Sequence, residues 1–245
     1  MRYTWFIISF LLFAAINSTI NAQQQVCVIN KGIGGNNSFD LLKRVHRDVL
    51  ELQPDLVIVL VGTNDLMNTK KMVPADRYIQ NLEQLTDTLT FHDMEVVVVS
   101  PPPVDEKYLF ERHDSTMFNM PPNTILSHAA AAIKELSQRK GYLFVDLFHD
   151  LSSKGIPDHN KDEIIVNITN SGKNDGVHFT KTGNVLLAQL IFNTINEKYG
   201  SLKGKRIVCF GDSLTFGAFM EGEGTANGNT YPAVLKKLIR SHVGN

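Results

Sequence analysis

Short apolar runs rich in β-branched residues alternate along the chain with longer segments of helical periodicity. The runs lie at 26–29, 56–61, 95–100, 142–146 and 206–210. Those at 56–61 and 95–100 (LVIVLV and EVVVVS) are apolar at nearly every position, which is typical of strands covered on both faces. Because these strands alternate with helices, we expect a three-layer α/β/α sandwich around a five-stranded parallel sheet.

Helices are expected between most of these strands and after the last one, at 38–53, 74–91, 123–140, 181–199 and 231–241. In the first of them the apolar residues recur three or four positions apart, which is the spacing of one helix face. Glycine, which is common just past the last turn of a helix, follows the third and fourth segments. In such folds the ligand site lies beyond the carboxyl ends of the strands, so the residues that follow each strand are the candidates for chemistry.

The first 22 residues have the layout of a secretory signal peptide. Arg2 precedes an apolar run at 6–16, and a short polar stretch ends at Ala22. The apolar run is shorter than the roughly 20 residues that cross a bilayer. We therefore expect residues 1–22 to be removed and residues 23–245 to form one domain. The protein is then expected to be secreted or periplasmic, with no stable membrane anchor.

The nearly equal numbers of basic and acidic residues bear on whether the protein binds nucleic acid. Lys and Arg number 24 and Asp and Glu number 25, for a formal net charge of −1, which excludes nucleic-acid binding driven by bulk charge. The short charge pairs Lys43–Arg44 and Lys70–Lys71 are expected on solvated surfaces. No H-E-x-x-H motif or Cys/His ligand spacing occurs in the sequence, so neither a metal nor a cofactor is expected.

Two cysteines, Cys27 and Cys209, are too few for a disulfide scaffold or a cysteine-rich zinc module. Both lie in apolar, strand-like runs, which favours two buried thiols that pack as small hydrophobic side chains. A disulfide between them is the alternative that an oxidising compartment leaves open.

Polar and glycine-rich segments stand at strand ends or at a helix entry. They are NKGIGGN at 30–36, GTND at 62–65, DGVHFT at 175–180 and GDSLT at 211–215. Together they supply a hydroxyl, an imidazole, carboxylates, a side-chain amide and glycine-rich backbone. Acyl transfer needs a serine, a histidine that takes its proton, a carboxylate that orients the histidine, and donors for the oxyanion.

These four segments resemble the sequence blocks of the SGNH hydrolases, also called GDSL esterases and lipases, over nearly all of residues 23–245. The resemblance implies a flavodoxin-like fold and a serine esterase that works through an acyl-enzyme. It also implies that Asp65 and Asp212 are structural residues that tie the turns. Phe179 departs from the pattern, because many members have proline after the histidine.

Position by position, the resemblance assigns the chemistry to five residues. Ser213 would be the nucleophile, His178 the general base and Asp175 the carboxylate that orients the histidine. The oxyanion hole would consist of the Ser213 and Gly35 N–H groups and the Asn64 side-chain amide. No cofactor or metal is implied.

The order of the blocks departs from the family, because the serine block at 206–245 comes last and not first. A circular permutation explains this order, with the strand at 206–210 entering the middle of the sheet through the linker at 201–205. One alternative is that 206–245 begins a second, truncated domain, but the preceding residues would then lack a central strand. Another is that this segment completes the sheet of a neighbouring molecule. We expect one permuted domain.

Two other site hypotheses use different residues. Asp146 and His149 form a second Asp-x-x-His that could supply the acid–base pair. The turn at 32–35 could cradle a phosphate, but Asn37 stands where a G-x-G-x-x-G motif needs glycine. Asp175 and His178 are favoured because they precede a helix in a glycine-containing turn.

The expected function is that of a secreted serine esterase. The absence of an amphipathic lid from the sequence pattern favours small acyl esters or carbohydrate O-acetyl esters over bulk lipid. The loop at 101–122, with Asp105, Tyr108, Phe110 and Phe118, either walls the acyl or alcohol pocket or merely covers the core. Lysophospholipase or thioesterase activity, and a non-catalytic glycan- or protein-binding module of the same fold, are the alternatives. These patterns leave the acyl chain, the alcohol and the oligomeric state open.

Overall fold

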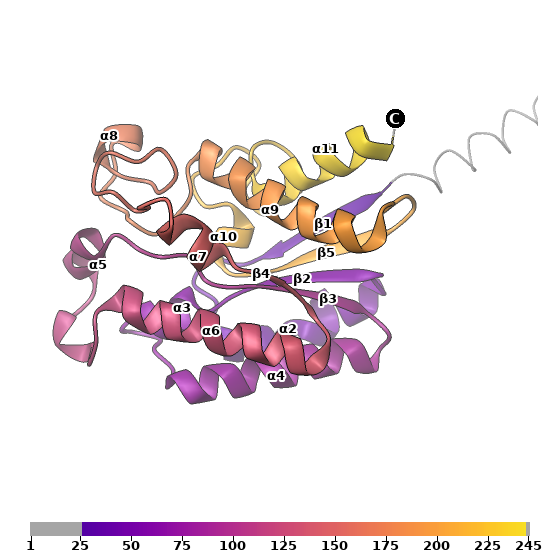
Figure 1. Cartoon of the computed structure of the whole chain (residues 1–245), viewed down its shortest axis with the longest axis horizontal. Helices are drawn as coiled ribbons and strands as arrows, with labels where there is room; N and C mark the ends of the chain where they lie inside the picture. The colour runs from indigo at the N-terminus through magenta and orange to yellow at the C-terminus, as the bar shows by residue number, and fades with distance from the viewer. Residues whose placement is uncertain (1–25, 244–245) are drawn as a thin grey trace, which may run out of the picture.

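Five parallel strands form one sheet in the computed structural model, which describes residues 26–243 (Figure 1). The predicted signal peptide at 1–22 lies outside the described residues. The strands follow the order β1-β5-β2-β3-β4. Their bounds are Cys27–Gly32 for β1, Leu56–Leu60 for β2, Glu95–Val99 for β3, Leu143–Val145 for β4 and Arg206–Gly211 for β5. The predicted α/β fold with a five-stranded parallel sheet is confirmed.

The last strand in the sequence lies second in the sheet. β5 pairs along its whole length with β1, from Cys27 opposite Arg206 to Gly32 opposite Gly211, and its other edge pairs with β2. Counted from β5, the strand order reads 2-1-3-4-5, which is the order of flavodoxin-like sheets. The carboxyl end of β5 therefore emerges between those of β1 and β2.

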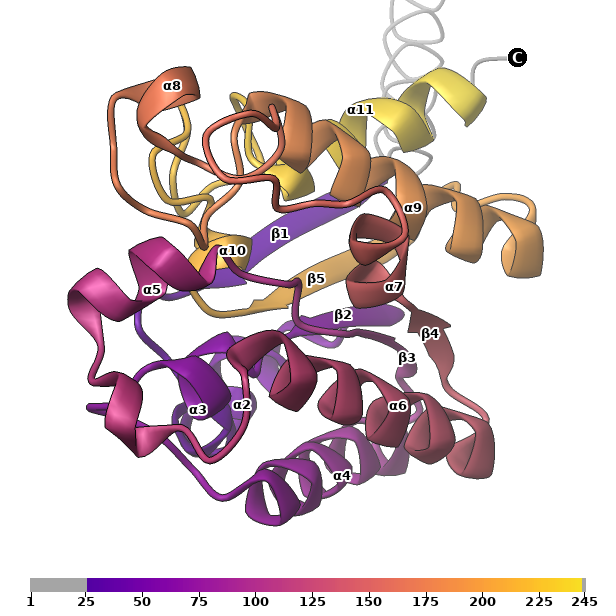
Figure 2. The same cartoon turned by 60° about the vertical axis from the view of Figure 1, so that its left-hand side comes forward.

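Long helices cover the two faces of the sheet (Figures 1 and 2). One layer consists of α2 (Ser38–Asp48), α4 (Ala75–Phe91) and α6 (Pro122–Lys140). The other contains α9 (Lys181–Tyr199) and α11 (Tyr231–Val243), with the short α7 (Leu147–Ser152) beside them. The remaining short helices are α3 (Thr63–Met67), α5 (Glu106–Arg112), α8 (Ile168–Ser171) and α10 (Ser213–Phe216), with 3₁₀ turns η1 (Leu50–Leu52) and η2 (Ser115–Met117).

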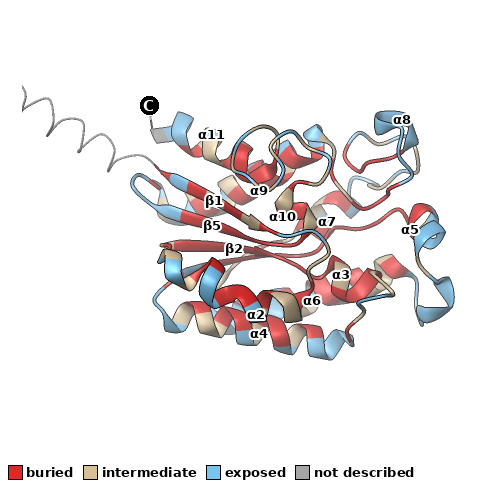
Figure 3. Ribbon diagram, turned by 180° about the vertical axis from the view of Figure 1, so that it is seen from behind, coloured by how far each residue is buried: buried red, intermediate tan, exposed pale blue. Residues whose placement is uncertain are grey.

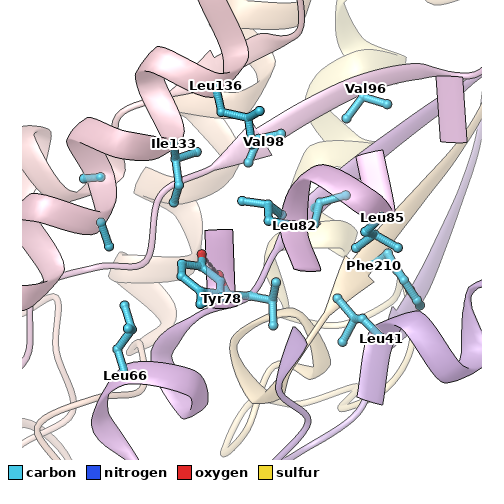
Figure 4. Close-up of a cluster of buried hydrophobic side chains, with 14 of the residues drawn as sticks. Leu41, Leu66, Tyr78, Leu82, Leu85, Val96, Val98, Ile133, Leu136 and Phe210 are labelled. Atoms are coloured by element: carbon cyan, nitrogen blue, oxygen red, sulfur yellow. Dashed lines mark hydrogen bonds between the residues drawn. The ribbon is translucent and has the colours of Figure 1, made fainter. Parts of the chain in front are cut away.

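The sheet divides the core into two apolar clusters. Successive residues of a strand point to opposite faces, so Val57 and Val59 join the cluster under α2, α4 and α6. Ile58 and Leu60 join the cluster under α9 and α11. Figure 4 shows the first cluster, and Figure 3 shows that the strands are buried along most of their length. This two-sided burial explains why the strand sequences are almost continuously apolar.

The long helices lie close to their predicted ranges, with one shortened end. α9 matches its prediction. α6 ends at Lys140 and is capped by Gly141, whose φ of +74° is the left-handed conformation that glycine adopts readily. The first helix, predicted at 38–53, ends at Asp48 and gives way to η1. Gln53 then takes a positive φ of 46°, so the chain leaves the helix axis before β2 begins.

The expectation of two buried thiols is half right. Cys209 is buried in the inner strand β5, and burial raises the pKa of its thiol to about 12. Cys27 is exposed, because it begins the edge strand β1 at a point where the helical layers do not cover it, and both cysteines are free. Within residues 26–243, no helix is both long and apolar enough to span a bilayer.

Candidate active site

The predicted nucleophile stands at the carboxyl end of β5, between β1 and β2. Ser213 is the first residue of α10, which follows the strand after a single intervening residue. That residue, Asp212, caps the helix, because its side chain accepts a hydrogen bond of 2.9 Å from the Leu214 N–H. The serine is thereby held at a sharp strand-to-helix turn.

A chain of hydrogen bonds joins the three residues predicted to carry the chemistry. His178 Nε2 lies 2.9 Å from Ser213 Oγ, and His178 Nδ1 lies 2.9 Å from Asp175 Oδ2. An ionised carboxylate only accepts hydrogen bonds, so the imidazole proton belongs on Nδ1. Nε2 is then free to accept the hydrogen bond that the Ser213 hydroxyl donates.

Asp175 is buried in a setting that keeps it ionised. Burial alone would raise its pKa, but the hydrogen bond and the charge of His178, with the backbone N–H groups of Val177 and His178, lower the pKa to about 2. Arg112 from α5 adds a bond of 3.1 Å to Asp175 Oδ2 and a second contact to the Asp175 carbonyl oxygen. The sequence reasoning missed Arg112, which stands 63 positions away with no motif to mark it.

The predicted oxyanion donors lie at the same edge of the sheet. Gly35 follows β1 with a φ of +74°, and Asn64 belongs to α3 after β2. The Asn64 side chain donates to the Asn36 carbonyl oxygen at 3.0 Å, which fixes the orientation of its amide. Gly35 and Asn64 line a cavity of about 240 Å³ together with Ser213 and His178.

Part of the predicted loop at 101–122 walls this cavity. Leu109, Arg112 and His113 line it, with Met67 of α3. The four residues proposed for that role, Asp105, Tyr108, Phe110 and Phe118, are not among the lining residues. Of the two alternatives for this loop, the structure favours the wall, but the wall is formed by residues of α5 and its C-cap other than the four proposed.

Asp105 and Tyr108 instead support the turn that carries Asp175 and His178. Asp105 donates its N–H to the Gly176 carbonyl oxygen at 2.8 Å, and its carboxylate lies 2.6 Å from His159 Nδ1. Gly176 has a φ of +73°, and a Cβ there would lie 2.9 Å from the Cβ atoms of Asp105 and Tyr108. The turn therefore requires glycine both for its backbone conformation and for this close approach.

Arg44 corrects the expectation of a solvated charge pair. Its side chain is buried, with the guanidinium 4.4 Å from the centre of the Phe210 ring. It donates to the Gly211 carbonyl oxygen at 2.7 Å and to Asn36 Oδ1 at 2.7 Å. Asp48, one turn further along α2, balances its charge at 3.0 Å. Arg44 thus joins the serine strand to the Gly35 loop.

Asp65 and Asp212, which the resemblance assigned to structural roles in the turns, are both buried carboxyl groups. Asp65 accepts 3.0 Å bonds from the Ser38 N–H, and burial raises its pKa. Burial raises the pKa of Asp212 to about 7. Among residues 26–243, Asp212 Oδ2 has no hydrogen-bond partner.

The rival site hypotheses place their residues in structural roles. Asp146 caps α7 by accepting a bond from the His149 backbone N–H. Gly32 packs against α10, because a Cβ at this position would lie 2.0 Å from the Phe216 nitrogen. The helix cap explains the aspartate at 146, and the close packing explains the glycine at 32, without a second acid–base pair or a bound phosphate.

Comparisons with known proteins give relatives of this chain. Residues 13–186 match the model of the GDSL-like lipase/acylhydrolase family, a match that ends before Ser213. A GDSL esterase/lipase of Arabidopsis thaliana, CPRD49, is 26% identical over 195 residues, which cover 76% of this chain and 72% of that protein. An acetylxylan esterase of Geobacillus stearothermophilus is 25% identical over 126 residues, 49% of this chain and 53% of that one.

Solved structures share the fold. The acetyl xylan esterase AlAXEase superposes with a TM-score of 0.53 at 26% identity, covering 67% of this chain and 78% of its own. A lipase/acylhydrolase from Enterococcus faecalis gives a TM-score of 0.53 at 24% identity, covering 67% and 72%.

Proposed function

The chain belongs to the GDSL-like lipase/acylhydrolase family and is a carboxylic ester hydrolase, and we propose that Ser213, His178 and Asp175 are its catalytic triad. The observation that carries this proposal is the hydrogen-bonded chain from Asp175 through His178 to Ser213 Oγ. It has the order and the contacts that activate a serine for acyl transfer.

In the first half of the reaction, His178 Nε2 takes the hydroxyl proton while Ser213 Oγ attacks the ester carbonyl carbon. The tetrahedral intermediate collapses when the bond to the alcohol oxygen breaks, and His178 returns its proton to that oxygen. The acyl group is then bonded to Ser213 Oγ. Water repeats the sequence with His178 as base, which releases the carboxylic acid and restores the serine.

Asp175 stabilises the imidazolium that forms in each half-reaction and keeps the proton on Nδ1. Its pKa of about 2 means that it remains ionised throughout the neutral range. Arg112 is a positioning residue in this scheme, because its contacts fix the carboxylate and the backbone carbonyl of Asp175.

The oxyanion of the intermediate would be stabilised by the Ser213 and Gly35 N–H groups and by Asn64 Nδ2. The Asn64 amide has two hydrogens, of which one is used by the Asn36 carbonyl oxygen, so the second is available. Preorganised donors of this kind supply a large share of the rate enhancement in acyl transfer.

The connectivity is proposed to be a circular permutation within one domain of residues 23–245. Two observations support it. The family match at 13–186 ends before the serine block, and β5 lies between β1 and β2 although it comes last in the chain. The short link at 201–205 connects α9 to β5 at the edge where the strands begin.

The proposed substrates are small acyl esters, in particular O-acetyl groups on carbohydrates outside the cell. The cavity of about 240 Å³ has room for a short acyl chain, against Met67, Leu109 and Val177. Acetylxylan esterases occur among the relatives and the solved structures. The signal-peptide pattern at 1–22 supports export.

A fluorophosphonate probe tests the assignment of Ser213 as nucleophile. We expect one equivalent of the probe to bind covalently, on the peptide that contains Ser213. The unlabelled protein should release acetate from acetylated xylo-oligosaccharides, and the labelled protein should not. A folded protein that takes up no probe and releases no acetate would favour the binding-module alternative.

A further inference from the structure

Phe219 stands beside the proposed active site in a backbone conformation that phenylalanine rarely adopts. Its φ is +71°, and the residue is 47% exposed although its side chain is large and apolar. Non-glycine residues with positive φ are uncommon, and such residues gather at functional sites. We propose that the Phe219 ring is the stacking surface for a sugar ring in the alcohol part of the substrate. This inference rests on the proposed function.

The loop that carries Phe219 is held by its own hydrogen bonds. The Phe219 N–H donates to Glu223 Oε1, and the Gly224 N–H donates to the Phe216 carbonyl oxygen at 2.7 Å. Asn30 of β1 adds a bond of 3.1 Å to the Thr225 carbonyl oxygen. The ring is therefore presented by an ordered loop, so little conformational freedom would be lost when a ligand binds.

The position of the ring relative to His178 places it on the alcohol side. The centres of the two rings lie 5.2 Å apart, with an angle of 79° between their planes. His178 must reach the oxygen of the departing alcohol to give it a proton, so the group attached to that oxygen passes close to Phe219. Phe219 is not part of the wall of the cavity beside Ser213. The acyl group therefore occupies the cavity, and the alcohol contacts Phe219.

The chemistry around the ring favours a polyhydroxylated ligand over an alkyl chain. The Lys173 ammonium lies over the ring, 5.0 Å from its centre, so a sugar ring that stacks on this face displaces the exposed lysine side chain. The C–H groups of a sugar ring carry partial positive charge and suit the same face. The exposed side chains of Lys173, which lies over the ring, and of Glu223, which binds the Phe219 N–H, supply a donor and an acceptor for hydroxyl groups.

The test compares kcat/KM for an acetylated xylo-oligosaccharide with kcat/KM for p-nitrophenyl acetate. In Phe219→Ala we expect the ratio of the two to fall about tenfold, mainly through KM for the oligosaccharide. Phe219→Trp should keep the ratio near that of the unchanged protein, because it retains an aromatic face. The matched control is Phe91→Ala, whose phenylalanine is 84% exposed at the end of α4, and it should change neither value.

An unchanged ratio in Phe219→Ala, or an equal fall for both substrates, would overturn the proposal. So would a selective loss with p-nitrophenyl octanoate in place of the oligosaccharide, because the ring would then contact the acyl chain. A failure of the proposed function would give a different result. Neither ester would then be hydrolysed by the unchanged protein at a rate that Ser213→Ala lowers.

Discussion

Arg44 of α2 donates a hydrogen bond of 2.7 Å to the carbonyl oxygen of Gly211, which lies 167 positions later in the sequence. The same guanidinium binds Asn36 and Asp48, so one buried cation connects the first strand–helix turn to the strand before Ser213. This contact therefore holds the segment around Arg44 against the serine strand at the edge of the sheet where the site lies.

Replacing this cation should destabilise the fold strongly. Arg44→Met leaves the Asp48 carboxylate and the Gly211 carbonyl without this donor, and we expect the free energy of unfolding to fall by about 3 kcal/mol. Urea unfolding measures the change. The exposed Arg77→Met on α4 is the control and should lie within about 0.5 kcal/mol of the unchanged protein. Equal losses in the two variants would contradict the account.

Two nearby glycines should differ in their tolerance of the same substitution. A Cβ on Gly32 would lie 2.0 Å from the Phe216 backbone nitrogen, so Gly32→Ala must displace α10 and Ser213 with it. Apart from the chain neighbours of Gly34, no atom of the described residues lies within 4 Å of a Cβ built at this position. We expect Gly32→Ala to lower the melting temperature and the esterase activity, the latter by at least about tenfold, and Gly34→Ala to be nearly neutral. A tolerated Gly32→Ala would be inconsistent with the packing described.

Removal of the Arg112 side chain should reduce turnover more than binding. In Arg112→Met the Asp175 carboxylate loses one of its fixed donors, and we expect kcat to fall about tenfold with little change in KM. Arg112→Lys should restore part of kcat, because it returns the charge without the second contact. Steady-state kinetics with p-nitrophenyl acetate measures both constants, and Arg139→Met on α6 serves as the control. A change confined to KM would show that Arg112 binds substrate and does not position Asp175.

Asp212 should make stability depend on pH. Burial raises its pKa to about 7 in the folded protein, against about 3.9 in the unfolded chain. The folded state therefore binds the proton more tightly, and this group destabilises the fold increasingly as pH rises from about 4 to about 7. Asp212→Asn lacks that charge. We expect the stability of the variant relative to the unchanged protein to increase by about 2–4 kcal/mol between pH 4 and pH 8. A difference that stays constant over this range would show that folding does not raise the pKa of Asp212.

The strands and long helices could be predicted because their signals are local. The continuous apolar runs of β2 and β3 report burial on both faces, and Gly141 and Gly200 mark helix ends within a few residues of sequence. The strand-end segments placed Ser213 and Asn64 at one edge of the sheet, because parallel strands bring their carboxyl ends together. His178 was found from a different signal, the glycine-containing turn before the helix at 181–199.

The missed features depend on distant contacts or on the exact backbone. Arg44 and Arg112 resemble surface charges in sequence, and only their partners 167 and 63 positions away show their roles. The exposure of Cys27 depends on how far the helical layers extend beyond an edge strand, which no local pattern reports. Phe219 resembles an ordinary apolar residue until its positive φ turns the ring toward His178.

The most direct test is the hydrolysis of p-nitrophenyl acetate by the purified protein beside Ser213→Ala, with the fold of the variant checked by circular dichroism. We predict that the unchanged protein hydrolyses p-nitrophenyl acetate. In Ser213→Ala, kcat should fall by a factor of roughly 10⁴ to 10⁶ while the variant remains folded. Such a loss would mean that the last block of the chain supplies the nucleophile to the histidine that precedes it. A folded Ser213→Ala variant with nearly full activity would contradict the account, because the reaction would then proceed without the proposed triad.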